Sequence, residues 1–155
     1  VLAGCSTGIF AQALNAITVQ FGMEQFLSFC RRRGVVSHLV SGGFVPIAGS
    51  IAKQLGFDHF HANGLKHANG ILTGELEGVI VDGAEKRRWM LERVAALGLD
   101  AGSAAAVGDG ANDIPMLNAV AVPVGHHAKL IVREHVTAHN ASASHLFLAA
   151  LLFGE

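Results

Sequence analysis

Residues 108–113 read GDGAND and lie between two apolar stretches, residues 104–107 and 114–117. An apolar run, a polar turn with glycines and a second apolar run predict a strand, a loop and a helix in that order. The glycines let the backbone come close to a ligand. No other stretch constrains the fold as much, because residues 108–113 specify where one strand ends and the next helix begins.

Asp109 and Asp113 stand four residues apart across this loop. Two carboxylates favour a hard cation such as Mg²⁺, which takes one or two protein carboxylates and completes its shell with water and phosphate oxygens. The alternative is an Asp-rich turn that caps the next helix, since Asn and Asp are preferred N-cap residues. The loop alone leaves both interpretations open.

The first half of the chain alternates between helical and extended patterns. Apolar residues recur at helical spacing on both sides of Gly22, and Gly34 is expected to end the second helix as a left-handed residue. Residues 35–40 are rich in β-branched residues, as in a buried strand, whereas repeated glycines between residues 63 and 81 predict a β-hairpin of residues 71–73 and 79–81. The expected elements are helices at 9–21, 23–33 and 44–55 and strands at 35–40 and 57–62.

The second half continues this alternation. We expect a helix over residues 84–97, with Trp89, Met90, Val94 and Leu97 towards the core. The remaining expected elements are a strand from 104, a helix at 115–119, a strand at 121–124, a helix from about 128, an edge strand at 136–139 and a helix at 146–152.

Strands that alternate with helices predict an α/β fold with a parallel sheet covered on both faces. In such sheets ligands bind beyond the carboxyl ends of the strands. Ser41 and Asp109 both follow predicted strands. If those strands are neighbours, one opening collects both loops.

The composition narrows the class of protein. The 155 residues are the size of one domain, and 51% hydrophobic with 15% charged residues supports a sizeable core. The net charge of −1 gives no basic field for nucleic acid, and residues 31–33 (RRR) fit the solvated end of a helix. No apolar run reaches the ~18 residues of a membrane span.

The cysteines and histidines suggest no metal cluster. Cys5 and Cys30 have no CxxC spacing and are expected to be buried free thiols of a cytoplasmic protein. The nine histidines show no zinc spacing, and we interpret the adjacent pair His126-His127 as a loop or helix start.

Two further segments could bind an anion such as phosphate. Ser41-Gly42-Gly43 offers a hydroxyl and backbone N–H groups at a helix start, where phosphate is favoured; the alternative is a tight turn with Ser41 as a cap. Lys86 opens the helix at 84–97, where a cation is slightly unfavourable without a partner, although a solvated surface lysine is the more frequent case.

The order of these signals resembles the haloacid dehalogenase (HAD) superfamily, in particular its phosphoserine phosphatase branch. The resemblance covers nearly the whole chain, and residues 108–113 are its most specific part. The matching pieces are residues 40–44 (VSGGF), 62–63 (AN), 72–74 (LTG), 80–82 (IVD), Lys86 and residues 108–113.

The resemblance implies a three-layer Rossmann-like core with a small β-hairpin insertion, formed by residues 1–155 as a single domain. It implies a Mg²⁺-dependent phosphomonoesterase that acts through an aspartyl-phosphate, with O-phosphoserine as the substrate. Ser41 and Lys86 would be catalytic, and Asp109 and Asp113 would bind or support the metal. The phosphate-binding set would be Ser41, Gly42, Gly43, Lys86 and Asn112.

One part of the family pattern is missing from these residues. The family carries its nucleophile and general acid in an Asp-x-Asp motif on the first strand, and none of the five aspartates here is spaced by two. The helical cap is also missing, with residues 1–21 resembling its end. We therefore expect an incomplete fragment that is inactive alone and self-associates through open sheet edges. The alternatives are another small-molecule phosphatase or phosphotransferase of the superfamily, or a non-catalytic remnant that binds phosphate or Mg²⁺.

Overall fold

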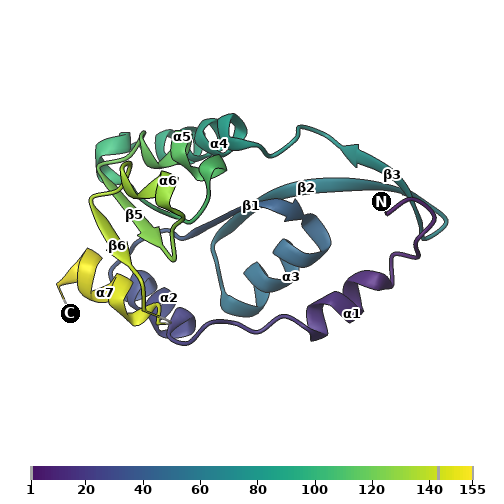
Figure 1. Ribbon diagram of the computed structural model, residues 1–155, viewed down its shortest axis with the longest axis horizontal. Coiled ribbons are helices and arrows are strands. Elements are labelled where there is room, and N and C mark those ends of the chain that lie inside the picture. The colour runs from purple at the N-terminus through teal and green to yellow at the C-terminus, as the bar shows by residue number, and fades with distance from the viewer. Residues whose placement is uncertain (1, 143, 155) are drawn as a thin grey trace. The chain divides into compact units, whose positions relative to one another are not determined.

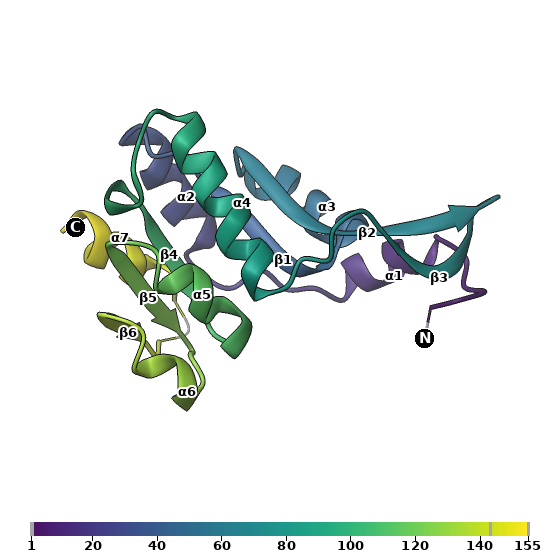
Figure 2. The same ribbon diagram turned by 90° about the horizontal axis from the view of Figure 1, so that it is seen from above.

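The computed structural model describes residues 2–142 and 144–154, and the chain divides into two compact units, Val1–Val81 and Asp82–Glu155. Each unit contains a three-stranded sheet and helices (Figure 1; Figure 2). The expected α/β class is therefore confirmed within each unit, whereas the single domain over residues 1–155 stays a prediction. No helix among the described residues is long and apolar enough to cross a membrane.

In the first unit the long strand β2 (His59–Ala68) pairs with a different strand along each half. Its first half is parallel to β1 (His38–Phe44), and its second half is antiparallel to β3 (Ile71–Glu77). The turn between β2 and β3 is Asn69-Gly70, and both residues have positive φ, as a type I′ hairpin turn requires. A hairpin is thus present in the expected region, but its strands differ from the predicted ones.

Helix α3 (Val45–Leu55) contacts β1 and β2 and buries Ala48, Ala52 and Leu55. Helices α1 (Ile9–Asn15) and α2 (Met23–Arg32) also contact α3, and α2 contributes the buried residues Leu27 and Cys30. Gly34 follows α2 with a φ of +67°, so the expected left-handed residue at this helix end is confirmed.

The second unit has an entirely parallel sheet in the order β4-β5-β6. Its buried core includes Ala106, Met116, Leu117, Ala128 and Val132. Short helices join the strands, and Figure 2 shows them beside the sheet. The elements are α4 (Gly83–Ala96), the 3₁₀ turn Ala101–Ser103, β4 (Ala105–Gly108), the 3₁₀ turn Ala111–Asp113, α5 (Ile114–Leu117), β5 (Val122–His126), α6 (Leu130–Arg133), β6 (Ala138–Asn140) and α7 (Leu146–Phe153).

Several predicted details are wrong. The first helix ends at Asn15 rather than at residue 21, and Ile17 and Phe21 are 43% and 67% exposed, so their helical spacing reflects no packed face. Leu97, expected in the core, is 46% exposed. In the hairpin, β3 pairs with the end of β2, and residues 79–81 form no strand.

The strand expected at residues 35–40 lies further along the chain, at His38–Phe44. Ser41-Gly42-Gly43 is therefore an irregularity inside β1 rather than a turn after it. Val40 lies opposite His61 and Phe44 opposite Asn63, so the first strand has two residues more than the second between these pairs. A bulge of this kind leaves residues unpaired and bends the strand, and such bulges are frequent beside active sites.

Candidate active site

Asp113 is the centre of a buried polar cluster in the second unit. Its Oδ1 accepts a hydrogen bond from Lys86 Nζ at 2.7 Å, while its Oδ2 accepts from the backbone N–H groups of Asp109 and Gly110 at 3.0 and 3.2 Å. Burial opposes ionisation, but the Lys86 ammonium and the two amides outweigh it and lower the pKa of Asp113. Asp113 is thus an anion that fixes both a lysine and the backbone of the loop.

Lys86 reaches this carboxylate from the first turn of α4 and is only 6% exposed. The turn is held by Asp82, whose side chain accepts from the Glu85 N–H at 2.9 Å as an N-cap. Glu85 in turn accepts two hydrogen bonds from Arg88. The unfavourable position of a cation at a helix start is therefore compensated by Asp113, which sequence reasoning could not show because the two residues are 27 apart.

Gly83 allows α4 to approach the loop, and Gly108 allows the loop to fold back closely on itself. A Cβ at Gly83 would lie 2.9 Å from the carbonyl oxygen of Asn112, and a Cβ at Gly108 would lie 2.5 Å from Cβ of Asp113. Neither position has room for a side chain. The close packing of α4 on the loop therefore requires glycine at position 83, and the compact shape of the loop requires glycine at position 108.

Asp109 differs from Asp113 in its surroundings. Its carboxylate is exposed and accepts no hydrogen bond from residues 2–142 and 144–154, whereas its backbone carbonyl accepts from the Lys129 N–H at 2.9 Å. The described residues include no cluster of three or more His, Cys, Asp or Glu side chains that could hold a metal. Asp109 is thus a single available carboxylate beside a fully engaged one, and Asn112 lies exposed on the same loop.

The predicted phosphate-binding segment of the first unit is held by a buried asparagine. Ser41 Oγ accepts from the Gly43 N–H at 3.0 Å, and the Gly42 carbonyl accepts from Asn63 Nδ2 at 2.7 Å. The Oδ1 of Asn63 accepts from the Val81 N–H at 2.8 Å, so this side chain joins the bulge to the end of the unit. The sequence offered only the pair Ala62-Asn63, and the positioning role of Asn63 was missed.

Ser41, Gly42 and Gly43 belong to the first unit, whereas Lys86, Asp109, Asn112 and Asp113 belong to the second. The structure brings together Lys86, Asp113 and the backbone of Asp109. The convergence of both groups on one phosphate stays a prediction.

A histidine cluster lies at the end of β5. His126 Nδ1 is 3.0 Å from Asn140 Nδ2, and the ring contacts those of His127 and His145 at centroid distances of 4.7 and 4.3 Å. Burial, helped by the neighbouring histidines, lowers the pKa of His126 to about 4. The pair predicted as a loop or helix start therefore comprises the last residue of β5 and the first of the turn after it.

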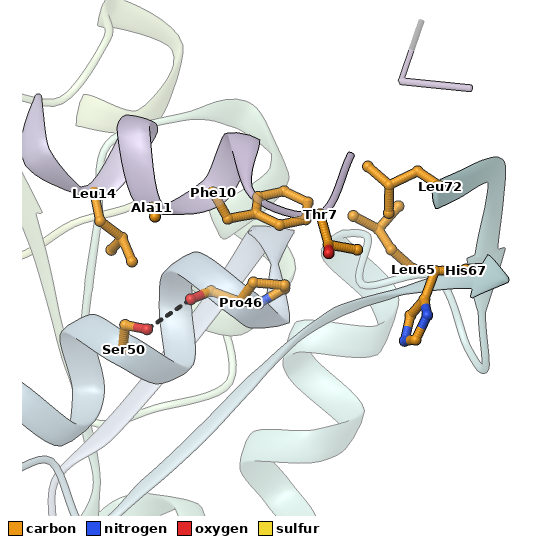
Figure 3. Close-up of a pocket in the computed structure, with 9 residues that line it drawn as sticks. All are labelled: Thr7, Phe10, Ala11, Leu14, Pro46, Ser50, Leu65, His67 and Leu72. Carbon is orange, nitrogen blue, oxygen red and sulfur yellow. Dashed lines mark hydrogen bonds between the residues drawn. The ribbon is translucent and has the colours of Figure 1, made fainter. Parts of the chain in front are cut away.

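An open pocket of about 420 Å³ lies within the first unit, between α1, α3 and the hairpin (Figure 3). Its lining is mostly apolar and contains none of the predicted site residues. The pocket is lined by Thr7, Phe10, Ala11, Leu14, Pro46, Ser50, Leu65, His67 and Leu72.

Comparison with known proteins defines the class. A family model for haloacid dehalogenase-like hydrolases matches residues 1–118. The chain belongs to this family, so the predicted superfamily and its Rossmann-like core are confirmed.

Several similar proteins within the family are phosphoserine phosphatases. That of Albidiferax ferrireducens is 44% identical over 117 residues, which cover 73% of this chain and 49% of the relative. That of Lactococcus lactis is 36% identical and covers 90% of this chain and 64% of the relative. A solved phospho-aspartyl intermediate analogue of a phosphoserine phosphatase is 31% identical, with a TM-score of 0.87 over 98% of this chain and 72% of that one. The chain therefore spans about half to two thirds of the length of these curated relatives.

Proposed function

We propose that this chain forms the phosphate-stabilising part of a Mg²⁺-dependent phosphoserine phosphatase that acts through an aspartyl-phosphate. The buried Lys86–Asp113 pair carries the proposal, because it anchors a cation to the loop at the carboxyl end of β4. Phosphoryl transfer requires mainly positioning and charge stabilisation, which a fixed lysine supplies. Sequence similarity to phosphoserine phosphatases supports the substrate class.

In this proposal each residue of the cluster has one task. Lys86 neutralises the transferring phosphoryl group and the nucleophile. Asp113 holds the Lys86 ammonium and, through the N–H groups of Asp109 and Gly110, the shape of the loop. With both its oxygens engaged, Asp113 acts as a positioning residue beside the metal.

The donor set fits Mg²⁺ with Asp109 as its protein ligand. Mg²⁺ accepts one or two carboxylates and retains several waters, so one exposed carboxylate suits it better than it suits zinc. When bound, the ion would offset the negative charge on the phosphoryl oxygens. Asp109→Asn should therefore lower Mg²⁺ affinity, whereas Asp58→Asn, at a carboxylate that accepts from the Ser37 N–H and hydroxyl, should not.

Ser41, Gly42, Gly43 and Asn112 would complete the phosphate contacts, with the Ser41 hydroxyl and the Gly42 N–H as donors and the Gly43 N–H holding Ser41 Oγ. The support is the bulge itself, which Asn63 fixes. The proposal extends to O-phosphoserine as substrate, serine biosynthesis as the pathway and the cytoplasm as the location.

A second candidate, a non-catalytic binder of phosphate or Mg²⁺, is favoured by one observation: the 155 residues contain no Asp-x-Asp spacing. The two candidates predict different results once the motif is supplied. We would therefore fuse the Asp-x-Asp segment and cap of the Albidiferax ferrireducens relative to the N-terminus and measure phosphate release from O-phosphoserine with and without Mg²⁺.

The fusion should release phosphate only with Mg²⁺, and the unfused chain should not. Lys86→Met should reduce turnover by about a thousandfold, the scale of losing one charge-stabilising group. Lys66→Met is the matched control, because Lys66 is an exposed lysine paired with Glu75 on the hairpin. A folded fusion without turnover would favour the non-catalytic binder. A fusion that hydrolyses other phosphomonoesters faster than O-phosphoserine would favour another phosphatase of the family.

A further inference from the structure

The three parallel strands of the second unit end at the same edge of their sheet. Gly108 lies opposite Gly125 and His126 lies opposite Asn140, so the loops after β4, β5 and β6 begin side by side (Figure 2). Asp109 begins the first of these loops and His127 the second. The proposed phosphate and metal site therefore has a second loop as its neighbour.

Backbone hydrogen bonds fasten this second loop on both sides. The Lys129 N–H donates to the Asp109 carbonyl at 2.9 Å, and the His127 N–H donates to the Asn140 carbonyl at 2.9 Å. Between them Ala128 is buried, and a Cβ at Gly125 would lie 2.9 Å from Cβ of Ala128. The loop is thus packed into a single position beside Asp109.

His127 has a backbone conformation that non-glycine residues rarely adopt, with a φ of +49°. Its side chain is nevertheless exposed. The exposed ring packs edge-on against His126, so burial of the side chain does not account for this conformation. Such residues cluster at ligand sites, where the surrounding structure enforces the geometry.

The neighbouring residues fix the orientation of the His126 ring. The Oδ1 of Asn140 accepts from the N–H and hydroxyl of Ser142 at 2.9 and 2.7 Å, which turns its Nδ2 towards His126 Nδ1. His126 is therefore the neutral tautomer with its proton on Nε2. The ring of His127 rests edge-on against this fixed ring.

We propose that His127 is a phosphate-contacting residue of the same site, donating an imidazole N–H to a phosphoryl oxygen. The inference rests on the proposed function and adds a residue that the family resemblance did not supply. It assigns His126 and Asn140 as positioning residues for His127. The ligand chemistry is that of a phosphomonoester or of the phosphate it releases.

The test uses inorganic phosphate with Mg²⁺ as the probe and the unmodified 155-residue chain. Binding is followed by NMR through the imidazole resonances. His127→Asn and His127→Gly both remove the ring, and both residues tolerate positive φ, so the fold should persist. Each should weaken phosphate binding about tenfold, the effect of one hydrogen bond to a charged group.

His135→Asn is the matched control. His135 precedes β6 and hydrogen bonds to Asn118, so it lies towards the other end of the strands, and its loss should leave phosphate affinity unchanged. Unchanged affinity in both His127 variants would overturn the inference.

Lys86→Met separates the two hypotheses: if it abolishes binding while the His127 variants do not, only this inference fails. If the wild-type chain shows no Lys86-dependent phosphate binding, the proposed site fails, and this inference fails with it.

Discussion

At the scale of single residues, we expect Asp113 to contribute more to stability than its partner Lys86. Asp113→Ala leaves a lysine of 6% exposure without its carboxylate and two backbone N–H groups without their acceptor, which should cost about 3 kcal/mol of unfolding free energy. Lys86→Met should cost less, because Asp113 keeps both amide donors. Urea denaturation of the two variants measures the difference, and equal losses would contradict the positioning role of Asp113.

The lowered pKa of His126 predicts how the free energy of unfolding depends on pH. Its pKa in the folded chain, about 4, lies below the ordinary value of 6.5, so the unfolded chain binds the proton more strongly. Stability is therefore complete above pH 6.5 and decreases as the pH falls towards 4, by about 2 kcal/mol once solvent screening is allowed for.

Urea denaturation at a series of pH values between 7.5 and 4.5 measures this slope. His126→Asn should flatten it, whereas His135→Asn should retain it. A slope unaffected by the loss of His126 would show that other groups bind the proton. The pKa of Asp113 is also lowered. The stability that ionised Asp113 contributes is therefore lost in a separate and more acidic range, below about pH 4.

At the scale of elements, substitution of Gly83 tests how closely α4 packs against residues 108–113. Alanine normally favours a helix over glycine by about 1 kcal/mol. Here the added Cβ would lie 2.9 Å from the Asn112 carbonyl oxygen, so Gly83→Ala should instead destabilise the chain by about 1 kcal/mol and shift the Lys86 resonances in NMR spectra. Gly8→Ala is the control, because its Cβ meets nothing closer than 3.5 Å. A more stable Gly83→Ala variant would contradict the close approach.

The sequence predicted those elements that local pattern determines. The strand and loop around residues 108–113 and the helix that carries Lys86 lie within a residue or two of their predicted positions, because glycines and caps mark their ends. The end of β1 was missed because pairing with β2 carries the strand through Gly42 and Gly43 despite their low strand propensity. The contact of Lys86 with Asp113 joins distant segments, and no local pattern encodes it.

At the scale of the whole molecule, the open edges of the two sheets predict self-association. Among the described residues, β1 pairs only with β2 and β4 only with β5, so each has one edge of unpaired backbone groups. Such edges recruit further strands unless charge or bulges prevent it, and β4 has neither. Sedimentation velocity should therefore show species larger than a monomer that increase with concentration.

Two valines separate an edge effect from a general change in solubility. Val107 lies on the edge strand β4 and Val122 on the central strand β5, and they are similarly exposed, at 37% and 36%. Val107→Lys should shift the chain towards monomer, because a charge on an edge strand discourages pairing. Val122→Lys adds the same charge away from an edge and should leave more of the larger species. Equal effects of both variants would assign the association to surface apolarity, and a monomeric wild-type chain at every concentration would refute it.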